Sequence, residues 1–262
     1  MTEHDVGSRA RITLTTPQRL SPEEFPFQAG DLGYSMRRYY IDEFFTRHVR
    51  QLTRGVRVLD IGGFRGKRRG RFNIAEHDFD VTVANIAPGA RPDLLCDACE
   101  IPCADGSFDV VVLAEVMEHL PDAPAALAEA GRVLRPGGVL LATVPFMFRV
   151  HSDPIDVARY APDWWTANLE ASGFCAGVIE PQGSLFGMMA ELARAWAYRL
   201  EETKSFWPGA RDTALGMLAK GRELALRHER GAAGSDPYYS SFTTGFGVRA
   251  YRSPSSNGES HA

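Results

Sequence analysis

Polar side chains follow the apolar segments in the first half of the chain, at the point where each segment ends. Asp60 closes one apolar run, and Asn85 and Asp97 follow the next two. Glu115 comes directly after the fourth. Apolar runs separated by turn residues and helical patterns predict the strands of a parallel sheet. Because ligands of such sheets bind outside the carboxyl ends of the strands, we expect these side chains to share one ligand-binding edge.

Glycine residues follow Asp60 almost at once. Gly62, Gly63 and Gly66 form a turn in which the missing side chains let the backbone approach a ligand closely. The N–H groups of such a turn bind an anionic group, while Asp60 attracts a cation. The turn therefore suits a small zwitterionic ligand better than a pyrophosphate. Its spacing also departs from the G-x-G-x-x-G pattern of dinucleotide-binding dehydrogenases.

A second group of polar residues lies after the fifth predicted strand, in a loop interrupted by Pro154. His151, Asp153 and Asp156 are our candidates for catalysis. An imidazole accepts a hydroxyl proton near neutral pH, and a neighbouring aspartate orients its ring. The alternative is that these side chains only satisfy the backbone of a proline turn. Their spacing is too generic to favour a divalent cation, so we expect no metal site.

Alternating strands and helices are needed to position these residues. Helical patterns cover residues 35–52 and 123–133 and alternate with the apolar strands. This alternation predicts βαβ units and helices on both faces of the sheet. After Gly173 the pattern predicts a sixth strand, and residues 242–252 predict a last one.

A long helical excursion separates the last two predicted strands. It covers residues 185–230, and Pro208 and Gly209 divide it into two halves. We interpret it as an insertion that serves as a substrate lid or an oligomer surface. The alternative is a pair of amphipathic helices packed on the edge of the sheet.

The order of these segments carries more information than any one of them. The segments VLDIGG, DVTVANI, LLCDACEIP, FDVVVLAEVMEHL and GRVLRPGGVLLATVPF follow one another along the chain. Together they resemble class I S-adenosylmethionine-dependent methyltransferases of the small-molecule, type 11-like group, over about residues 58–183. The resemblance implies S-adenosyl-L-methionine as the cofactor. It also implies an α/β fold with a Rossmann-like, doubly wound, mostly parallel sheet, an antiparallel last strand and a helical insertion before that strand.

The resemblance assigns roles to the residues at the strand ends. Asp60 and the loop 62–66 flank the methionine part of the cofactor, Asn85 receives the ribose hydroxyls, and Asp97 and Ala98 meet the adenine. The predicted cofactor-binding residues are Asp60, Gly62, Gly63, Gly66, Asn85, Asp97, Ala98 and Glu115.

Two positions depart from the family pattern. Phe64 stands where the D-x-G-x-G-x-G pattern has its middle glycine, and Asn85 stands where the usual ribose ligand is acidic. An amide accepts a hydrogen bond from a hydroxyl but brings no charge, so we expect weaker ribose binding.

The composition of the 262 residues sets the wider frame. A formal net charge of -4 gives no general reason to bind nucleic acid or a membrane. We expect a flexible N-terminus over residues 1–17, one methyltransferase domain over 18–252 and a disordered tail over 253–262. No apolar run approaches the roughly 20 residues of a membrane helix and no signal peptide is evident, so we expect a cytoplasmic protein. The clustered cysteines at 96, 99 and 103 fit reduced thiols better than an iron–sulfur site.

We therefore predict an S-adenosylmethionine-dependent methyltransferase that acts on a small-molecule hydroxyl, either sugar-like or of a secondary metabolite. The basic run 67–71 follows the glycine turn where a helix N-terminus would prefer acidic residues, and it indicates either an anionic acceptor or a solvated basic face. One alternative is an N-methyltransferase of a small molecule. Another is a catalytically inactive methyltransferase-like binding or regulatory protein, which the departures at Phe64 and Asn85 favour.

Overall fold

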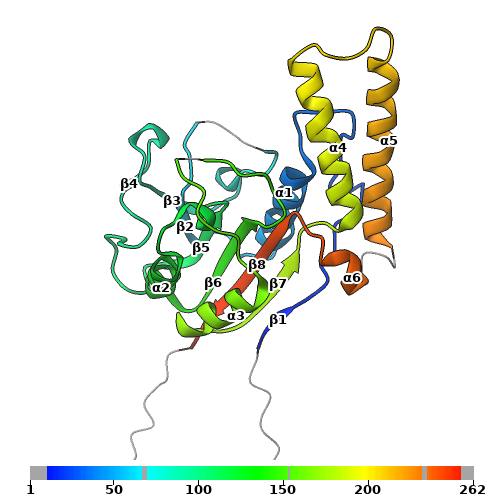
Figure 1. Cartoon of the computed structure of the whole chain (residues 1–262). Helices are drawn as coiled ribbons and strands as arrows, with labels where there is room; N and C mark the ends of the chain where they lie inside the picture. Colours follow the sequence, from blue (N-terminus) through cyan, green and yellow to red (C-terminus); the bar gives the residue numbers. More distant parts are fainter. Residues whose placement is uncertain (1–10, 67–69, 153, 232–234, 255–262) are drawn as a thin grey trace, which may run out of the picture.

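The computed structural model describes residues 11–66, 70–152, 154–231 and 235–254 (Figure 1). These residues form an eight-stranded sheet in the order β1-β7-β8-β6-β5-β2-β3-β4. The strands are β1 (Ile12–Leu14), β2 (Arg57–Ile61), β3 (Asp80–Asn85), β4 (Leu94–Leu95), β5 (Phe108–Ala114), β6 (Leu134–Pro145), β7 (Phe174–Pro181) and β8 (Gly245–Arg252). The α-helices are α1 (Met36–Val49), α2 (Ala123–Val133), α3 (Pro162–Ala171), α4 (Leu185–Glu202), α5 (Arg211–Arg230) and α6 (Pro237–Ser240). The 3₁₀ turns are η1 (Ile74–Glu76), η2 (Pro88–Ala90) and η3 (Met117–His119).

The direction of the strands confirms the predicted fold class. β8 pairs antiparallel with both β6 and β7, and every other strand pair is parallel. The strand that breaks the parallel pattern is therefore the last one, and the helical excursion comes before it in sequence. This is the Rossmann-like sheet with an antiparallel last strand that the resemblance implies.

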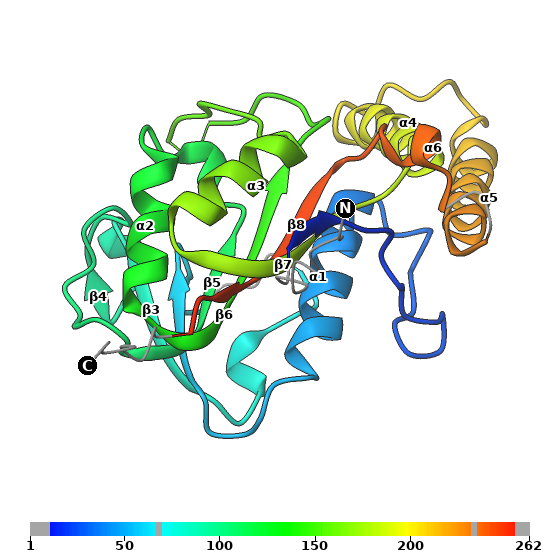
Figure 2. The same ribbon diagram turned by 90° about the horizontal axis from the view of Figure 1, so that it is seen from below.

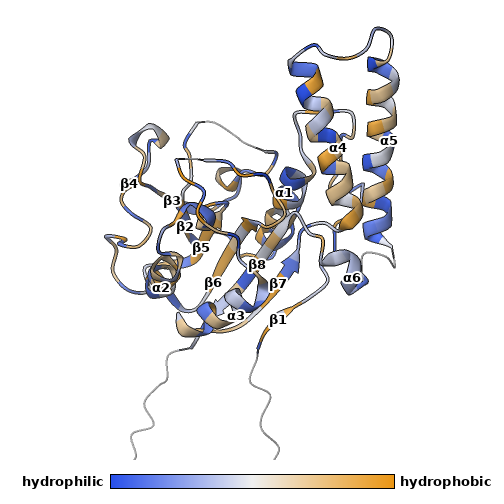
Figure 3. Ribbon diagram, in the orientation of Figure 1, coloured by the Kyte–Doolittle hydropathy of each residue, from blue (hydrophilic) through white to orange (hydrophobic). Residues whose placement is uncertain are grey.

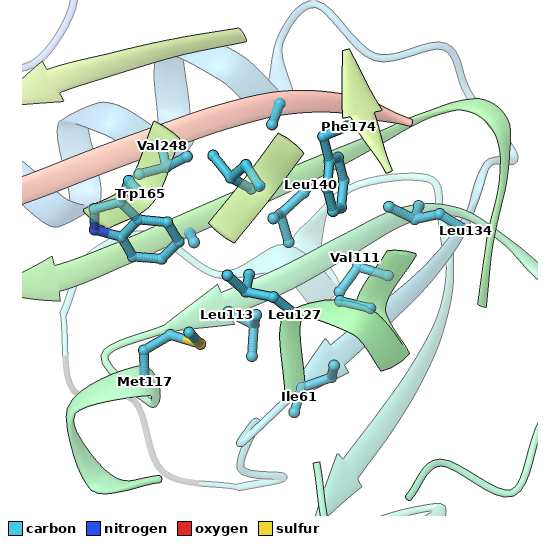
Figure 4. Packing of buried hydrophobic residues seen from close by; sticks show 14 of the residues in the cluster. Ile61, Val111, Leu113, Met117, Leu127, Leu134, Leu140, Trp165, Phe174 and Val248 are labelled. Carbon is cyan, nitrogen blue, oxygen red and sulfur yellow. The ribbon is translucent and has the colours of Figure 1, made fainter. Parts of the chain in front are cut away.

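Helices cover both faces of the sheet, with α1 on one side and α2 and α3 on the other (Figure 2). The larger core lies under α2 and α3, where Leu127 and Trp165 pack with strand residues such as Leu113 and Val248 (Figure 4). Each fully buried aliphatic side chain of this kind contributes roughly 1.5–3 kcal/mol to folding.

α1 is buried on two sides, and its buried residues include polar ones such as Asp42 and Glu43. Its N-cap Ser35 accepts a hydrogen bond from the backbone N–H of Arg38, as polar N-caps do. Phe44 and Phe45 pack against strands β2, β5 and β6, whereas Tyr39 and Tyr40 belong to a cluster shared with α4 and α5. The helical pattern predicted over residues 35–52 is confirmed as α1.

α4 and α5 form an antiparallel hairpin that projects from the body of the molecule beside α1 (Figure 1). Hydrophobic and hydrophilic residues are mixed along both helices (Figure 3). A cavity of about 540 Å³ lies between them and is lined mainly by apolar residues, among them Met189, Trp196 and Met217. The predicted helical insertion is confirmed as structure, while its service as a lid or an oligomer surface stays a prediction.

Local features of the structure differ from the expected ones near the N-terminus and around the sheet. The N-terminus is not flexible over the whole of residues 1–17, because Ile12–Leu14 forms β1. The backbone of β1 pairs with the edge of β7, and Ile12 is buried there. Residues 1–10 lie outside the described part of the chain, as do residues 255–262 of the predicted tail. Residues 135–138, which include Pro136 and two glycines, bulge within β6, and Gly137 has a φ of +72°. Between the glycine turn and η1, the described residues 70–73 form no α-helix.

Candidate cofactor and acceptor site

The predicted site residues come together at one edge of the sheet. β2 pairs in parallel with β3 and β5, and β3 pairs in parallel with β4. The carboxyl ends of these four neighbouring strands therefore lie along the same edge. Asp60, Asn85, Asp97 and Glu115 are at or just after those ends, in the spatial order Asp97, Asn85, Asp60, Glu115.

The glycine turn is shaped by close packing as much as by backbone conformation. Gly62 has a φ of +78°, and a Cβ atom there would lie 2.4 Å from Val116 Cγ2. A Cβ atom on Gly63 would lie 2.3 Å from Asp60 Oδ2. Gly66 has a φ of +107° with open space around it. The absence of a side chain at Gly62 and Gly63 therefore lets the backbone pass close to Val116 and Asp60. Gly66 supplies a left-handed backbone.

Phe64 is compatible with this turn. It is not among the described residues with a positive φ, so its backbone does not need glycine. Its side chain is 48% exposed and extends toward solvent. The departure from the family pattern at this position therefore leaves the path of the turn intact.

Asp60 lies beneath the turn and is mostly buried. Burial raises the pKa of its carboxyl group to about 7, although the guanidinium of Arg65 acts in the opposite direction. A cationic ligand group placed against Asp60 would favour the ionised carboxylate. Without such a group, the carboxyl of Asp60 is only partly ionised near neutral pH.

Asn85 has a structural task that an acidic residue could not perform. Its Nδ2 donates a hydrogen bond to the carbonyl oxygen of Gly63 at 2.9 Å, and its Oδ1 accepts one from the N–H of Ala87 at 2.9 Å. A carboxylate has no N–H to donate. The amide therefore ties the end of β3 to the glycine turn, which gives a physical reason for this departure from the pattern.

Asp97 and Ala98 lie beyond β4, next to Asn85 on the edge. Asp97 is exposed, and its Oδ1 accepts a hydrogen bond from the N–H of Cys99 at 2.9 Å. Ala98 is partly buried against the main core. Ile86 directly follows Asn85 and Leu95 ends β4, and their exposed side chains supply apolar surface at the same edge.

Glu115 is held by the scaffold. Its φ of +58° places it in the left-handed region, which costs a non-glycine residue of order 1 kcal/mol. Both of its carboxylate oxygens accept hydrogen bonds from the guanidinium of Arg37, a residue of α1 that is only 3% exposed. Arg37 also donates to Gln182, which precedes α4. Arg37 was missed by sequence reasoning because its partners are far away along the chain.

His151 and Asp156 are neighbours, as predicted. The backbone N–H of His151 donates to Asp156 Oδ2 at 2.8 Å, and His151 Nδ1 lies 3.3 Å from the same oxygen. The guanidinium of Arg159 keeps the pKa of Asp156 well below its usual range, so the residue is an anion beside the imidazole. Asp153 lies outside the described residues.

Glu118 is a further residue of this region that the sequence did not single out. It belongs to η3, is 0% exposed, and lies within reach of His119 and His151. Burial, followed by the nearby charge of Glu115, raises the pKa of Glu118 to about 8. A glutamate beside a histidine just after a strand was visible in the sequence, but its burial depends on the loop after β6 folding over it.

The basic run 67–71 is only partly described. Residues 67–69 lie outside the described part of the chain. The side chain of Arg71 contacts other parts of the protein: its guanidinium donates to the carbonyl of Pro26 and stacks over Tyr34. The predicted attraction of an anionic acceptor therefore stays a prediction.

Part of this edge of the sheet lies in a stretch that matches a known family. Residues 67–142 match a family described as a methyltransferase domain, and this stretch contains β3, β4, β5, α2 and most of β6. Over these residues the chain resembles a methyltransferase domain. S-adenosylmethionine is the cofactor of this class of domain, so the corresponding expectation from the sequence is confirmed.

Curated relatives resemble this chain over part of their length. The ubiquinone/menaquinone biosynthesis C-methyltransferase UbiE of Paraburkholderia phymatum is 38% identical over 103 residues, which is 33% of this chain and 42% of that protein. The ubiquinone biosynthesis O-methyltransferase of Parvibaculum lavamentivorans is 32% identical over 122 residues, which is 42% of this chain and 48% of that protein. The chain thus spans less than half the length of these two relatives.

A solved structure supports the fold. A SAM-dependent methyltransferase from Archaeoglobus fulgidus is 16% identical and matches with a TM-score of 0.51. The match covers 88% of this chain and 97% of the other. In the described residues, no helix combines the length and the apolar composition needed to cross a bilayer.

Proposed function

We propose that this chain transfers a methyl group from S-adenosylmethionine to a hydroxyl group of a small-molecule acceptor. The observation that carries the proposal is the imidazole of His151, held by the ionised Asp156 near the edge that carries the cofactor turn. An O-methyltransferase needs a group that accepts the hydroxyl proton during attack. One of the curated relatives is named an O-methyltransferase, which supports the same reading.

The cofactor edge fits the proposed ligand. The cofactor supplies an electrophilic methyl group on a sulfonium and an ammonium and carboxylate at its other end. We propose that Asp60 accepts hydrogen bonds from the ammonium group; the turn above it has no room for a side chain at Gly62 or Gly63. We further propose that Asn85 and Asp97 accept hydrogen bonds from the ribose and the adenine, with Ala98 against the adenine.

The acceptor oxygen must be held in line with the methyl group while water is excluded. Positioning of this kind is worth about 7–11 kcal/mol of the barrier. We propose that His151 Nε2 takes the hydroxyl proton as the oxygen forms its bond to the methyl carbon. The carbon–sulfur bond breaks with its electron pair going to sulfur, and Asp156 stabilises the imidazolium that results.

The surroundings of His151 indicate the kind of acceptor. Four exposed apolar residues lie in the loop that carries it: Met147, Val150, Ile155 and Val157. A surface of this kind favours an acceptor with an apolar body over a sugar-like one. We therefore propose the hydroxyl of a secondary metabolite, such as a phenol, as the acceptor class.

An inactive binding protein is the alternative from another functional class. The departures that favoured it, Phe64 and Asn85, both fit a formed cofactor turn, as their contacts above indicate. A C-methyltransferase is a second alternative, because another relative carries that name.

The test uses His151→Ala, with His77→Ala as the matched control. His77 lies at the C-terminal end of η1, before β3, and so belongs to the opposite edge of the sheet. The protein is incubated with labelled S-adenosylmethionine and a panel of phenols and other hydroxylated metabolites. Mass spectrometry identifies the acceptor that takes up the label, and that acceptor is used to measure kcat. We expect His151→Ala to lower kcat about 10²- to 10⁴-fold while cofactor affinity stays unchanged. An unchanged kcat would contradict the role of His151, and no label on any acceptor in a cofactor-binding protein would favour the inactive alternative.

A further inference from the structure

Three ligand-type side chains meet between the end of β5 and the loop after β6. Glu118 Oε1 lies 3.7 Å from Nε2 of His119 and 3.9 Å from Nε2 of His151. One ligand atom of each residue lies within 4.8 Å of the others. Ligands about 2.0–2.2 Å from a shared ion are themselves separated by roughly 3–3.5 Å. Small side-chain movements would therefore bring the three atoms to the separations of a coordination shell.

The state of Glu118 points to a missing ligand. Its side chain is completely buried, and neither carboxylate oxygen accepts a hydrogen bond from any described residue. Buried carboxylates in proteins are paired, hydrogen-bonded or bound to metals, because an unsatisfied one is costly. Nε2 of His119 and Nε2 of His151 are the imidazole nitrogens that face Oε1 of Glu118. Both are too far from this oxygen for a hydrogen bond.

The outer contacts of both histidines direct their Nε2 atoms toward Glu118. The Nδ1 atom of His119 is in hydrogen-bond contact with the carbonyl oxygen of Ile155, which can only accept, so Nδ1 must donate. The Nδ1 atom of His151 lies 3.3 Å from the carboxylate of Asp156. With the proton on Nδ1, each Nε2 presents a lone pair. Metal-binding histidines are oriented by backbone carbonyls and carboxylates in this way.

We propose that Glu118, His119 and His151 bind one divalent transition-metal ion. Two imidazoles and one carboxylate suit Mn²⁺, Fe²⁺ or Zn²⁺ and leave coordination positions open for another ligand. These three residues do not stand out as a ligand set in the sequence, because His151 lies far along the chain from Glu118 and His119. We infer that an open position takes the oxygen of the acceptor.

This inference rests on the proposed function and changes how the acceptor is activated. When the ion is bound, His151 Nε2 is occupied by the metal and cannot accept the proton. The ion then lowers the pKa of the acceptor hydroxyl, whose proton leaves to solvent, and the oxygen forms its bond to the methyl carbon as the carbon–sulfur bond breaks. His151 serves as the base only in the metal-free chain.

Mn²⁺ is the best probe for the site. The thiols of Cys96, Cys99 and Cys103 lie in the same chain and would compete for Zn²⁺, whereas Mn²⁺ prefers nitrogen and oxygen ligands. The full chain is stripped with a chelator and titrated with MnCl₂ alone, and free Mn²⁺ is followed by electron paramagnetic resonance. We expect one ion per chain.

The variant Glu118→Gln keeps the shape of the side chain and removes its charge, and Glu223→Gln on an exposed face of α5 is the matched control. We expect Glu118→Gln to bind Mn²⁺ at least tenfold more weakly and Glu223→Gln to bind like the wild type. Asp156→Asn, which leaves all three ligands in place and changes the group that orients His151, should weaken binding 10- to 100-fold. S-adenosylmethionine binding by each variant reports whether the domain is folded.

Two results would overturn the metal site: no one-to-one binding of Mn²⁺ by the wild type at millimolar concentration, or equal binding by wild type and Glu118→Gln. Full methyl transfer by chelator-stripped protein would overturn the role of the ion and leave the proposed function intact. Loss of cofactor binding by the wild type would instead contradict the proposed function, while the Mn²⁺ titration would still decide the metal site.

Discussion

Asp60 shows how one residue can couple cofactor binding to pH. Its carboxyl group sits below a turn that would clash with any side chain at Gly63, and burial raises its pKa to about 7. Because the folded-state pKa lies above the ordinary value, the folded state disfavours the ionised form. The unliganded protein should therefore lose some stability as the pH rises from about 4 to about 7.

Cofactor binding should have the opposite dependence on pH. An ammonium group against Asp60 requires the carboxylate, which is about 9% populated at pH 6 and about 91% at pH 8 for a pKa near 7. We expect the affinity for S-adenosylmethionine to rise about tenfold over that range, with proton release on binding. Calorimetry in buffers of different ionisation enthalpy measures both. Asp60→Asn should bind weakly with a flat pH profile, and a wild-type profile that is equally flat would show that Asp60 does not meet the ammonium group.

For single residues, the sequence predicted those positions that depend only on neighbouring residues along the chain. The glycine turn and the strand-end residues Asn85 and Asp97 follow directly from local pattern, and they lie at the expected edge. The sequence did not predict that Arg37 pairs with Glu115, or that Glu118 is buried without a hydrogen bond. Those properties arise from contacts between distant segments, which no local pattern encodes.

The α4–α5 hairpin is anchored by one carboxylate at its base. Glu229 near the end of α5 accepts hydrogen bonds from the backbone N–H groups of Ser184 and Gly187, at the N-terminus of α4. It also accepts from the hydroxyl of Tyr40 on α1. A negative charge at a helix N-terminus is favourable, and here it comes from the other helix of the pair. One side chain thus joins three helices.

Loss of this charge should loosen the hairpin. We expect Glu229→Gln to lower the free energy of unfolding by about 1–3 kcal/mol, because hydrogen bonds to a charged acceptor are replaced by weaker ones in a buried site. Urea denaturation followed by circular dichroism measures the change. Glu223→Gln on the same helix is exposed and should change stability by no more than about 0.5 kcal/mol. Equal effects of the two substitutions would show that Glu229 does not anchor the hairpin.

Long elements were predicted well and short ones were not. The helices α1, α2, α4 and α5 carry enough turns for their apolar pattern to be recognised. β1 has three residues, and only its pairing with β7 makes it a strand. The bulge in β6 likewise depends on the partner strand, since Leu134 pairs with Phe108 and Val139 with Val110.

Across the whole molecule, a chain of side-chain contacts connects the α4–α5 hairpin with the ligand-binding edge of the sheet. β7 runs in the same direction as β6, so α4 starts from the same edge of the sheet as the cofactor turn. Gln182, in the connection between β7 and α4, bonds to Arg37, and Arg37 pairs with Glu115 at the end of β5. A movement of the hairpin would therefore shift Arg37 and Glu115 at the site, which agrees with the prediction that the hairpin is a substrate lid.

A crystal structure with S-adenosylhomocysteine tests most directly whether the cofactor binds at the edge formed by the ends of β2, β3, β4 and β5. We expect the amino acid part against Gly62, Gly63 and Asp60, and the ribose and adenine along the ends of β3 and β4. The same ligand found only in the cavity between α4 and α5, with this edge of the sheet empty, would contradict the account.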